Sequence, residues 1–258
     1  MDLRTDDTVL ITGGGRGIGR ALAHRFHAAG ARILVADLDQ AAAETVASEV
    51  DGRALAVDVG DEASVAAMCD AALDAHGRVD VFVSNAGILS IGGLEASEAV
   101  WQQSWQVNFM AHVYAARRLV PPMLERGRGA FLLTASAAGL LNQIGAAPYA
   151  VSKHATVAFA EWLHFTHADQ GLEVVCICPL GVRTPMLEAQ RGLEPLADHL
   201  AETAVEPEAV ADAAFDALAA RRFLALPDPQ ALDFFRHKAA DYDRWLAGMH
   251  RLKTKLFG

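Results

Sequence analysis

The feature that most constrains the fold of this chain is an alternation of short apolar segments with longer helical patterns along most of its length. The apolar segments are rich in valine, isoleucine and leucine, and several are continuously apolar, which is typical of strands covered by helices on both faces. Such repeats predict βαβ units and a parallel sheet. The predicted strands are residues 8–12, 32–36, 53–57, 80–84, 130–135, 172–178 and 223–226.

Helical patterns fill the intervals between these strands. The predicted helices are residues 17–29, 40–50, 61–76, about 98 toward Pro121-Pro122, and about 148–170. The chain contains no linker, low-complexity tract or internal repeat, so we expect one domain over residues 1–258. The fold class predicted is α/β, with a doubly wound parallel sheet of about seven strands and helices on both faces.

Composition narrows the possible partners. Of the 258 residues, 52% are hydrophobic, which is enough for a substantial core, and the formal net charge is −10. The absence of clustered lysine and arginine argues against a nucleic-acid surface, because phosphate binding needs such clusters. No apolar stretch approaches membrane-spanning length and the N-terminus lacks signal-peptide features, so we expect no membrane contact and a cytoplasmic protein.

The cysteines favour no metal or redox site. Cys176 and Cys178 stand two apart in a predicted strand, where their side chains point to the same face. No set of histidine or cysteine ligands lies nearby in the sequence, so buried thiols are the preferred interpretation and we expect no metal.

A glycine-rich turn connects the first predicted strand directly to a helix. It has the sequence Thr12-Gly13-Gly14-Gly15-Arg16-Gly17-Ile18-Gly19. Glycines at such a turn let backbone amides approach a pyrophosphate, and the helix N-terminus presents unpaired N–H groups. The strand before the turn and the helix after it favour a dinucleotide-binding turn over a glycine-rich turn without a ligand.

Asp37 follows the second predicted strand, where a Rossmann fold places an acid that binds the adenosine ribose. A carboxylate there repels a 2′-phosphate. No basic residue stands beside it, since Leu38 follows, although Arg16 in the turn could offset part of a phosphate charge. The pattern favours NAD over NADP, and the alternative is that Asp37 only begins a turn.

Tyr149 and Lys153 stand four residues apart in a predicted helix, so their side chains share one face. A nearby ammonium favours the phenolate, so the pair is expected to lower the pKa of Tyr149 toward neutral pH and to allow proton transfer. Taken alone, such a pair is more often a solvated surface pair, and further residues must support a catalytic role.

Further motifs accompany this pair in a consistent order along the chain. They are Asn85-Ala86-Gly87 after the fourth predicted strand, Asn108 in the following helix, Ser136 after the fifth strand, and Pro179-Leu180-Gly181-Val182-Arg183-Thr184 after the sixth. The turn itself fits T-G-x-x-x-G-x-G. Over nearly its whole length the chain therefore resembles the classical short-chain dehydrogenase/reductase family, which implies a Rossmann-type domain and an NAD-dependent alcohol dehydrogenase or ketoreductase.

The resemblance implies a role for each catalytic residue. Tyr149 would act as general base in alcohol oxidation and as general acid in carbonyl reduction. Lys153 would bind the nicotinamide ribose and lower the pKa of Tyr149. Ser136 would steady the substrate oxygen, and Asn108 would hold a water in the proton relay. Each residue also has a simpler interpretation when taken singly, such as a helix cap for Ser136 or a helix kink for Asn108.

The resemblance also implies the cofactor contacts. Asp58 and Val59 would meet the adenine, Asn85 and Ala86 the adenosine side, and Val182 and Thr184 the carboxamide. The expected cofactor residues are Gly13, Gly15, Arg16, Gly17, Ile18, Gly19, Asp37, Asp58, Val59, Asn85, Ala86, Gly87, Tyr149, Lys153, Pro179, Val182 and Thr184.

The residues expected at the substrate are mostly apolar. They are Ser136, Ala138, Ile144, Tyr149, Leu180, Met186 and Leu187. Apart from Arg183 no basic residue accompanies them, which favours a hydrophobic secondary alcohol and its ketone over an anionic substrate. Leu180 departs from the family pattern, which has glycine there, and we expect its side chain to project into the substrate pocket.

Two further segments carry expectations. The family places a mobile substrate loop at about residues 185–206, and we expect it to close over bound ligand. An amphipathic helical tail is predicted at about 229–254, with aromatic residues that pack either on their own subunit or across a subunit boundary. The family also implies a homo-oligomer, more often a tetramer than a dimer.

Two other functions are open at this point. One is an NADP-linked carbonyl reductase, which titration with both cofactors would distinguish. The other is a catalytically idle NAD-binding sensor or scaffold, which loss of Tyr149, Lys153 or Ser136 would indicate, and all three residues are present.

Overall fold

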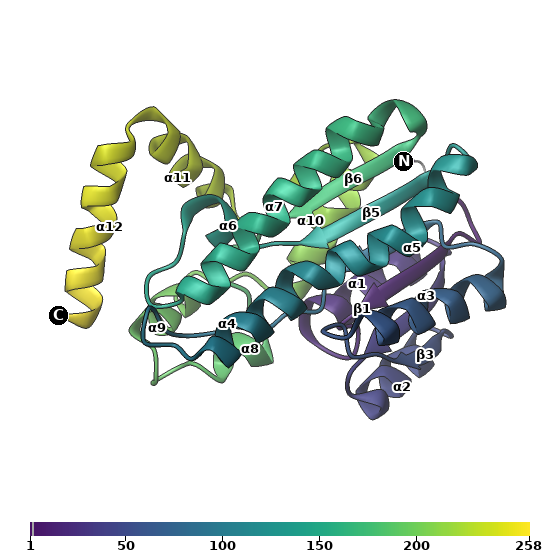
Figure 1. Ribbon diagram of the computed structural model, residues 1–258, viewed down its shortest axis with the longest axis horizontal. Coiled ribbons are helices and arrows are strands. Elements are labelled where there is room, and N and C mark those ends of the chain that lie inside the picture. The colour runs from purple at the N-terminus through teal and green to yellow at the C-terminus, as the bar shows by residue number, and fades with distance from the viewer. Residues whose placement is uncertain (2) are drawn as a thin grey trace.

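A parallel sheet forms the centre of the computed structural model, which describes residues 1 and 3–258 (Figure 1). Its strands are β1 Thr8–Thr12, β2 Arg32–Asp37, β3 Arg53–Ala56, β4 Val81–Ser84, β5 Gly129–Thr134, β6 Leu172–Ile177 and β7 Leu224–Ala225, in the spatial order β3-β2-β1-β4-β5-β6-β7. All neighbouring strands are parallel. The predicted fold class is confirmed, and the strand order reverses between β1 and β4, where ligands bind in such sheets.

A single helix connects each pair of consecutive strands from β1 to β4, and several helices connect each pair after β4. The helices are α1 Gly17–Ala28, α2 Gln40–Glu49, α3 Glu62–His76, α4 Glu98–Trp105, η1 Gln106–Met110, α5 Ala111–Glu125, α6 Ala138–Leu141, α7 Ala147–His167, η2 Ala168–Gln170, α8 Pro185–Glu188, α9 Pro195–Ala201, α10 Pro207–Ala219, α11 Pro229–Ala240 and α12 Tyr242–Phe257. Several begin where a side chain caps the first turn, since Asp39, Asp61 and Ser97 each accept a backbone N–H bond there.

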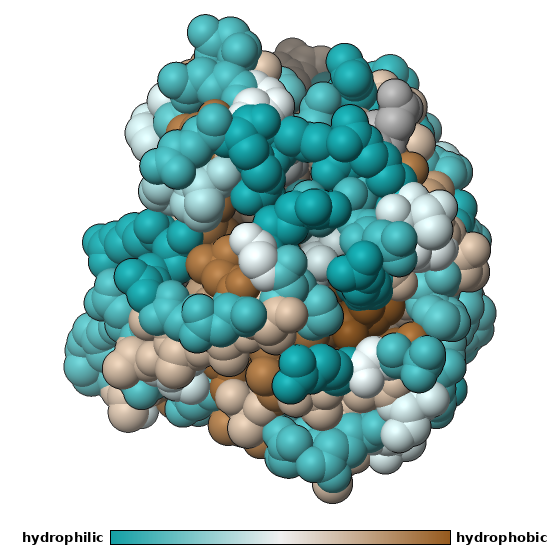
Figure 2. Space-filling view, turned by 90° about the vertical axis from the view of Figure 1, so that its right-hand side faces the viewer, coloured by the Kyte–Doolittle hydropathy of each residue, from teal (hydrophilic) through white to brown (hydrophobic). Residues whose placement is uncertain are grey.

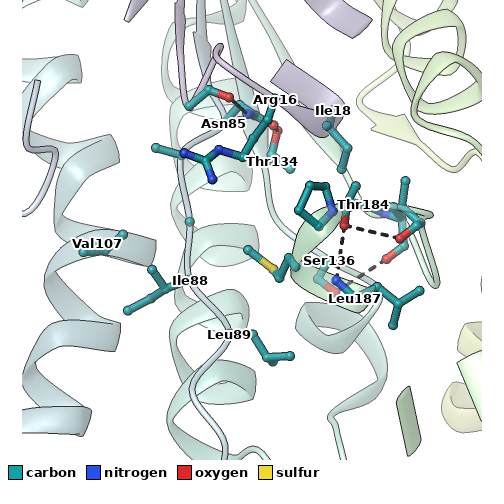
Figure 3. A pocket seen from close by; sticks show the side chains of 18 of the residues that line it. Arg16, Ile18, Asn85, Ile88, Leu89, Val107, Thr134, Ser136, Thr184 and Leu187 are labelled. Atoms are coloured by element: carbon teal, nitrogen blue, oxygen red, sulfur yellow. Dashed lines mark hydrogen bonds between the residues drawn. The ribbon is translucent and has the colours of Figure 1, made fainter. Parts of the chain in front are cut away.

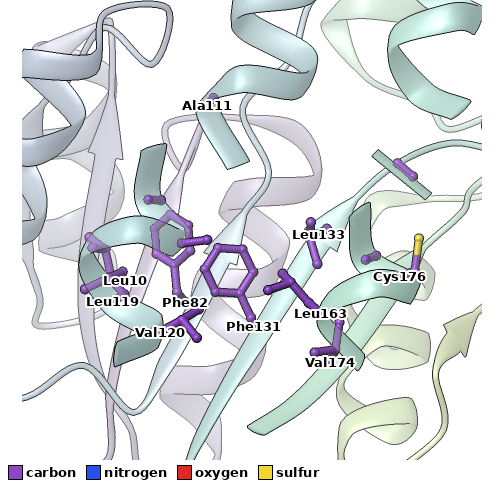
Figure 4. Packing of buried hydrophobic residues seen from close by; sticks show 14 of the residues in the cluster. Leu10, Phe82, Ala111, Leu119, Val120, Phe131, Leu133, Leu163, Val174 and Cys176 are labelled. Carbon is purple, nitrogen blue, oxygen red and sulfur yellow. The ribbon is translucent and has the colours of Figure 1, made fainter. Parts of the chain in front are cut away.

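The strands divide their side chains between two hydrophobic layers. Leu10, Phe82 and Phe131 belong to the layer under α3, α5 and α7 (Figure 4), where the rings of Phe82 and Phe131 lie 5.0 Å apart. Ile11 and Val83 belong to the layer under α1, α2 and α10. Neighbouring residues of a strand point to opposite faces, so each strand contributes side chains to both layers. The strands are therefore nearly continuously apolar, as the sequence predicted.

The helix predicted from residue 98 toward Pro121-Pro122 differs from the observed one in two ways. A short π-helix, η1, interrupts it between α4 and α5, and α5 continues through both prolines to Glu125. The prolines remove two backbone N–H donors, so two hydrogen bonds of the last turns are missing, and the helix ends within one turn of them. The π-helix matters more because it contains Asn108.

The last third of the chain contains more separate helices than the sequence patterns predicted. Two short helices, α8 and α9, lie within the predicted loop 185–206. The tail forms two helices, α11 and α12, separated at Asp241, whose side chain caps α12 by accepting from the Arg244 N–H. Figure 1 shows α12, in yellow, at the far end of the molecule from β1 and α3.

The end of the sheet at which the strands begin is polar and contains ion pairs. Figure 2 shows this side, where α5 ends and β5 begins, and hydrophilic residues cover most of it. The buried carboxylates of Asp7 and Asp80 precede β1 and β4, and Arg128, before β5, lies 2.6 Å from Asp7 Oδ2 and 3.1 Å from Asp80 Oδ1. In the described part of the chain, no helix is long and apolar enough to cross a membrane.

Candidate active site

A cleft of about 770 Å³ opens at the carboxyl ends of the strands. Most of the predicted cofactor residues line it: Gly13, Arg16, Gly17, Ile18, Asp37, Asp58, Val59, Asn85, Ala86, Gly87, Tyr149, Lys153, Pro179, Val182 and Thr184. Gly15 and Gly19 do not line it. The volume is in the range that a cofactor and a small substrate require.

The glycines of the turn are needed because the backbone passes very close to its neighbours. A Cβ on Gly13, whose φ is +62°, would lie 2.8 Å from the Ala86 Cα. A Cβ on Gly19 would lie 2.0 Å from the Gly13 carbonyl oxygen, so this residue lets α1 start directly against the turn. The turn thus holds a shape that leaves room for a pyrophosphate at the helix N-terminus.

Asp37 is fixed at the cleft by two backbone donors. The N–H of Gly15 donates to Asp37 Oδ2 at 2.9 Å, and the N–H of Asp39 donates to Oδ1 at 3.0 Å. The carboxylate therefore points between the turn and the end of β2. Nearby, the guanidinium of Arg16 lies 3.2 Å from the Asp39 carboxylate, so its charge already has a partner.

Ser136, Tyr149 and Lys153 meet at the centre of the cleft. The Ser136 side chain acts to lower the pKa of Tyr149, and the ammonium of Lys153 lies 5.8 Å from the centre of the Tyr149 ring. Lys153 Nζ donates to the Thr134 carbonyl oxygen at 2.8 Å, which ties α7 to the end of β5. The end of β5 and the first turns of α7 thus bring a hydroxyl, a phenol and an ammonium together.

Burial dominates the acid–base properties of this group. Desolvation lowers the pKa of Lys153 to about 8. Desolvation also raises the pKa of Tyr149, while its hydrogen bond with Ser136 opposes the rise. The sequence predicted a lowered pKa for Tyr149 through Lys153; in the structure the net shift of the Tyr149 pKa is upward, because burial disfavours the phenolate by more than the Ser136 side chain favours it.

Asn108 lies behind the cleft rather than on its surface. Its Oδ1 accepts from the Ile88 N–H at 2.9 Å, and its Nδ2 donates to the Ile88 carbonyl at 3.0 Å. The side chain is fully buried and also donates to Ser152 Oγ at 3.1 Å. Its backbone carbonyl accepts from Thr156 Oγ1 at 2.8 Å. Asn108 thus holds the segment after β4 against η1.

One buried polar residue beside this group had no part in the predictions. His112 is one helical turn after Asn108, and its Nδ1 lies 2.6 Å from Ser84 Oγ. Burial, the charge of Lys153 and the Asn108 backbone act on the ring, and burial lowers the pKa of His112 to about 3. Within the described residues its Nε2 has no hydrogen-bond partner. The spacing of Asn108 and His112 on one helix face was the only signal available.

The substrate end of the cleft is mainly apolar (Figure 3). Leu180, Met186 and Leu187 line it as predicted, whereas Ala138 is buried below the surface and Ile144 lies outside the lining. Leu89 lines the cleft, as expected of an apolar residue after β4. The lining residues that the predictions missed are Leu38, Asp39, Val57, Ile88, Gln103, Val107, Thr134, Ala135, Gln143, Gly181, Pro185 and Leu200. Arg183 is engaged by Glu206 at 3.1 Å and does not line the cleft.

The departure at Leu180-Gly181 has a packing explanation. Leu180 lines the cleft and also packs against the hydrophobic layer under α7. A Cβ on Gly181 would lie 2.8 Å from the Leu200 carbonyl oxygen, so the glycine allows the end of α9 to approach β6 closely. The Val205 N–H donates to the Gly181 carbonyl at 3.0 Å, which joins the residues after β6 to those before α10.

Asp58 and its neighbours complete the other end. The Gly60 N–H donates to Asp58 Oδ1 at 2.9 Å, and Asp58 and Val59 both line the cleft beside Asp37. No group of three or more histidine, cysteine, aspartate or glutamate side chains among the described residues is arranged to hold a metal ion.

Comparison with known proteins gives a consistent set of matches. A family model described as short chain dehydrogenase matches residues 7–194. The chain is 38% identical over 240 residues to 1-deoxy-11-beta-hydroxypentalenate dehydrogenase of Streptomyces exfoliatus, covering 90% of this chain and 86% of the relative. It is 35% identical to 3beta-hydroxysteroid dehydrogenase 2 of Eggerthella lenta, covering 69% and 71%.

Solved structures agree with these matches. A short chain dehydrogenase/reductase from Burkholderia phymatum in complex with NAD superimposes with a TM-score of 0.85 at 29% identity, covering 93% of this chain and 96% of that one. Levodione reductase superimposes with a TM-score of 0.81 at 27% identity, covering 89% and 99%.

Proposed function

The chain belongs to the short-chain dehydrogenase family, and from this premise we propose that it is an NAD-dependent oxidoreductase that interconverts a hydrophobic secondary alcohol and its ketone. The observation that carries the proposal is the meeting of Ser136, Tyr149 and Lys153 in one cleft whose other end holds Asp37. A hydroxyl, a phenol and a buried ammonium are the groups that proton transfer at a substrate oxygen requires.

The proposed mechanism assigns the proton to Tyr149. In oxidation Tyr149 Oη takes the proton of the substrate hydroxyl, and in reduction it returns one to the carbonyl oxygen. Ser136 holds that oxygen by a hydrogen bond, and the Lys153 ammonium favours the phenolate form of Tyr149, which accepts the proton in oxidation and is left behind in reduction. NAD, when bound, supplies the hydride acceptor or donor for the substrate carbon.

The fit to NAD rests on Asp37 and the glycine turn. Asp37 presents a carboxylate held by the Gly15 and Asp39 amides, which suits two ribose hydroxyls and opposes a 2′-phosphate. Arg16 is already paired with Asp39, so a phosphate would have to compete for it. The Burkholderia phymatum neighbour in complex with NAD supports the same choice.

The proposed substrate class rests on the apolar end of the cleft. Leu89, Leu180 and Leu187 offer no charge to an anionic group, and Arg183 is engaged by Glu206. Two relatives are named for hydroxyl-bearing substrates, one of them a hydroxysteroid, which supports a bulky apolar alcohol. A cytoplasmic homo-oligomer, with four subunits rather than two, stays a prediction from the sequence and the family.

The test combines both parts of the proposal. The chain is screened with secondary alcohols and NAD or NADP by the absorbance of the reduced cofactor. We expect NAD to be favoured by roughly 30-fold to 1000-fold in kcat/KM, because a like charge and lost hydrogen bonds oppose NADP. Asp37→Ser should weaken NAD and narrow the gap. Equal efficiency with NADP would overturn the cofactor assignment and favour an NADP-linked carbonyl reductase.

A chain that binds NAD and oxidises none of the alcohols tested, and reduces none of their ketones, would overturn the catalytic assignment. That result would favour the sensor or scaffold function in its place.

A further inference from the structure

The segment 85–87 follows β4 directly, and all three of its residues line the cleft. Figure 3 shows the side chain of Asn85 and, one residue beyond the segment, that of Ile88 in this lining. The segment belongs to no helix or strand, so contacts from other elements must fix its course.

The end of β1 holds the segment from one side. Thr12 Oγ1 accepts from the Asn85 N–H at 3.0 Å and from the Ala86 N–H at 3.2 Å. The Asn85 side chain donates to the carbonyls of Thr12 and Gly13, at 3.1 and 3.2 Å. These bonds tie the segment to the glycine turn, and contacts from the other side act on the two residues that flank it.

Two buried residues, one helical turn apart, hold these flanking residues. Asn108 accepts from the Ile88 N–H at 2.9 Å and donates to the Ile88 carbonyl at 3.0 Å, and His112 Nδ1 lies 2.6 Å from Ser84 Oγ. Among the described residues, the ring of His112 is the hydrogen-bond partner of the buried Ser84 hydroxyl. Asn108 and His112 thus form a bracket around the segment, with one residue at each end.

The ring of His112 is neutral in this place. Burial lowers the pKa of His112 to about 3, so at pH 7 one ring nitrogen carries a proton and the other does not. Within the described part of the chain Nε2 has no hydrogen-bond partner, and a buried N–H without an acceptor is costly. We therefore assign the proton to Nδ1, which donates to Ser84 Oγ.

We propose that His112 is a positioning residue for the cofactor, acting through Ser84 to hold the start of the segment 85–87 at the cleft. With both ends held, the segment has its binding shape before the cofactor arrives, so little ordering cost opposes binding. If His112 only filled space between α5 and β4, an apolar side chain of similar size would replace it without effect on the segment. The cofactor half of this inference rests on the proposed function; the bracket itself does not.

The bracket is tested by amide hydrogen exchange on the full chain without NAD. In His112→Leu we expect exchange at Asn85 and Ala86 to rise about tenfold relative to the amides of β5, which report global unfolding. Ile88 keeps its own bonds and should change less than about twofold. Leu119→Ala is the matched control, since it removes a buried apolar side chain from the same helix. Unchanged exchange in His112→Leu, or an equal rise in the control, would overturn the bracket.

Cofactor binding is tested by titration calorimetry with NAD. His112→Leu should raise the Kd for NAD about tenfold, because binding must then order the segment, whereas Leu119→Ala should leave it unchanged. His112→Asn should restore the Kd to within about twofold of the wild type, since its amide nitrogen can take the place of Nδ1. His112→Gln reaches the place of Nε2 instead and should not restore it. An unchanged Kd in the leucine variant, or equal rescue by glutamine and asparagine, would overturn the positioning role.

Ser84→Ala removes the same hydrogen bond from the strand side and serves as the second variant if His112→Leu does not fold. We expect the same rise of about tenfold in Kd, and less than about twofold more in the double variant, because both changes remove one interaction. An unchanged Kd in Ser84→Ala, or additive losses, would overturn the proposal. Absence of NAD binding in the wild-type chain would overturn the proposed cofactor and the cofactor half of the inference, while the exchange result still judges the bracket.

Discussion

The two ends of the sheet differ in whether their buried charged side chains have a charged partner. At the N-terminal ends of the strands, the buried carboxylates of Asp7 and Asp80 share the guanidinium of Arg128, and Arg78 adds a second contact to Asp80 at 2.9 Å. At the carboxyl ends, Lys153 is buried and donates to the carbonyl of Thr134, and no carboxylate lies within ion-pair distance of it in the part of the chain described.

The difference separates stability from reactivity. The paired charges of Asp7, Asp80 and Arg128 hold three strand starts together, whereas a buried charge without a counterion has a shifted pKa and destabilises the fold. The residues that bear the chemistry are thus on the less satisfied side of the same strands. Four variants test this comparison, arranged by the size of the free-energy change expected.

Arg128→Met should have the largest effect, because it leaves two buried carboxylates without their shared cation. We expect the free energy of unfolding to fall by about 3–5 kcal/mol, measured by urea denaturation at pH 7. The matched control is Arg117→Met, whose exposed pair with Glu62 should contribute less than about 1 kcal/mol. Equal losses in the two variants would contradict the structural role of the ion cluster.

Tyr149→Phe should reduce turnover by about 100-fold or more, which corresponds to about 2.7 kcal/mol in the activation barrier. The ring is kept and only the proton-carrying oxygen is lost, so NAD binding measured by fluorescence titration should change little. Near-normal turnover in this variant would remove Tyr149 from the mechanism.

Lys153→Met should abolish activity and yet stabilise the fold at pH 7. The net gain expected is about 2 kcal/mol, after subtraction of the hydrogen bond to Thr134 that is lost. Burial lowers the folded-state pKa of Lys153 to about 8, below the ordinary 10.5. Between these values the unfolded chain binds more protons, so wild-type stability from this group rises with pH, and the variant should lack that rise. Urea midpoints at pH 7 and 10 check both points; a less stable variant at pH 7 would contradict the account.

His112→Asn should have the smallest effect, visible only in acid. Burial lowers the folded-state pKa of His112 to about 3 from 6.5, so the unfolded chain binds more protons between these values and stability from this group is lost as pH falls below 6.5. Asparagine can keep a hydrogen bond to Ser84 without titrating. Between pH 6.5 and 5.5 the variant should lose about 1 kcal/mol less than the wild type; parallel losses would show that His112 does not titrate on unfolding.

Much of the fold could be predicted because its signals are local. The first strand, 8–12, has the predicted bounds, since a short apolar run between a polar start and a glycine turn indicates a buried strand of that length. The central group at Ser136, Tyr149 and Lys153 was found because each follows a recognisable element of the family's order. Asp37 was placed for the same reason, at the end of β2.

The remaining features depend on contacts between distant segments. Val107 and Leu200 line the cleft only because η1 and α9 pack where they do, and neither segment has a local pattern that states this. The direction of the Tyr149 pKa was wrong because burial, which a sequence does not display, dominates it. The hydrogen bond from Lys238 to the Leu140 carbonyl joins residues almost a hundred positions apart.

The π-helix at residues 106–110 places the position of Asn108 one residue out of step with an ordinary α-helix. Each residue turns an α-helix by about 100°, so deleting one residue between α4 and α5 would restore a continuous helix while rotating everything on one side of the deletion by that angle. The helix would then have regular hydrogen bonds, but Asn108 could not face both Ile88 and Ser152.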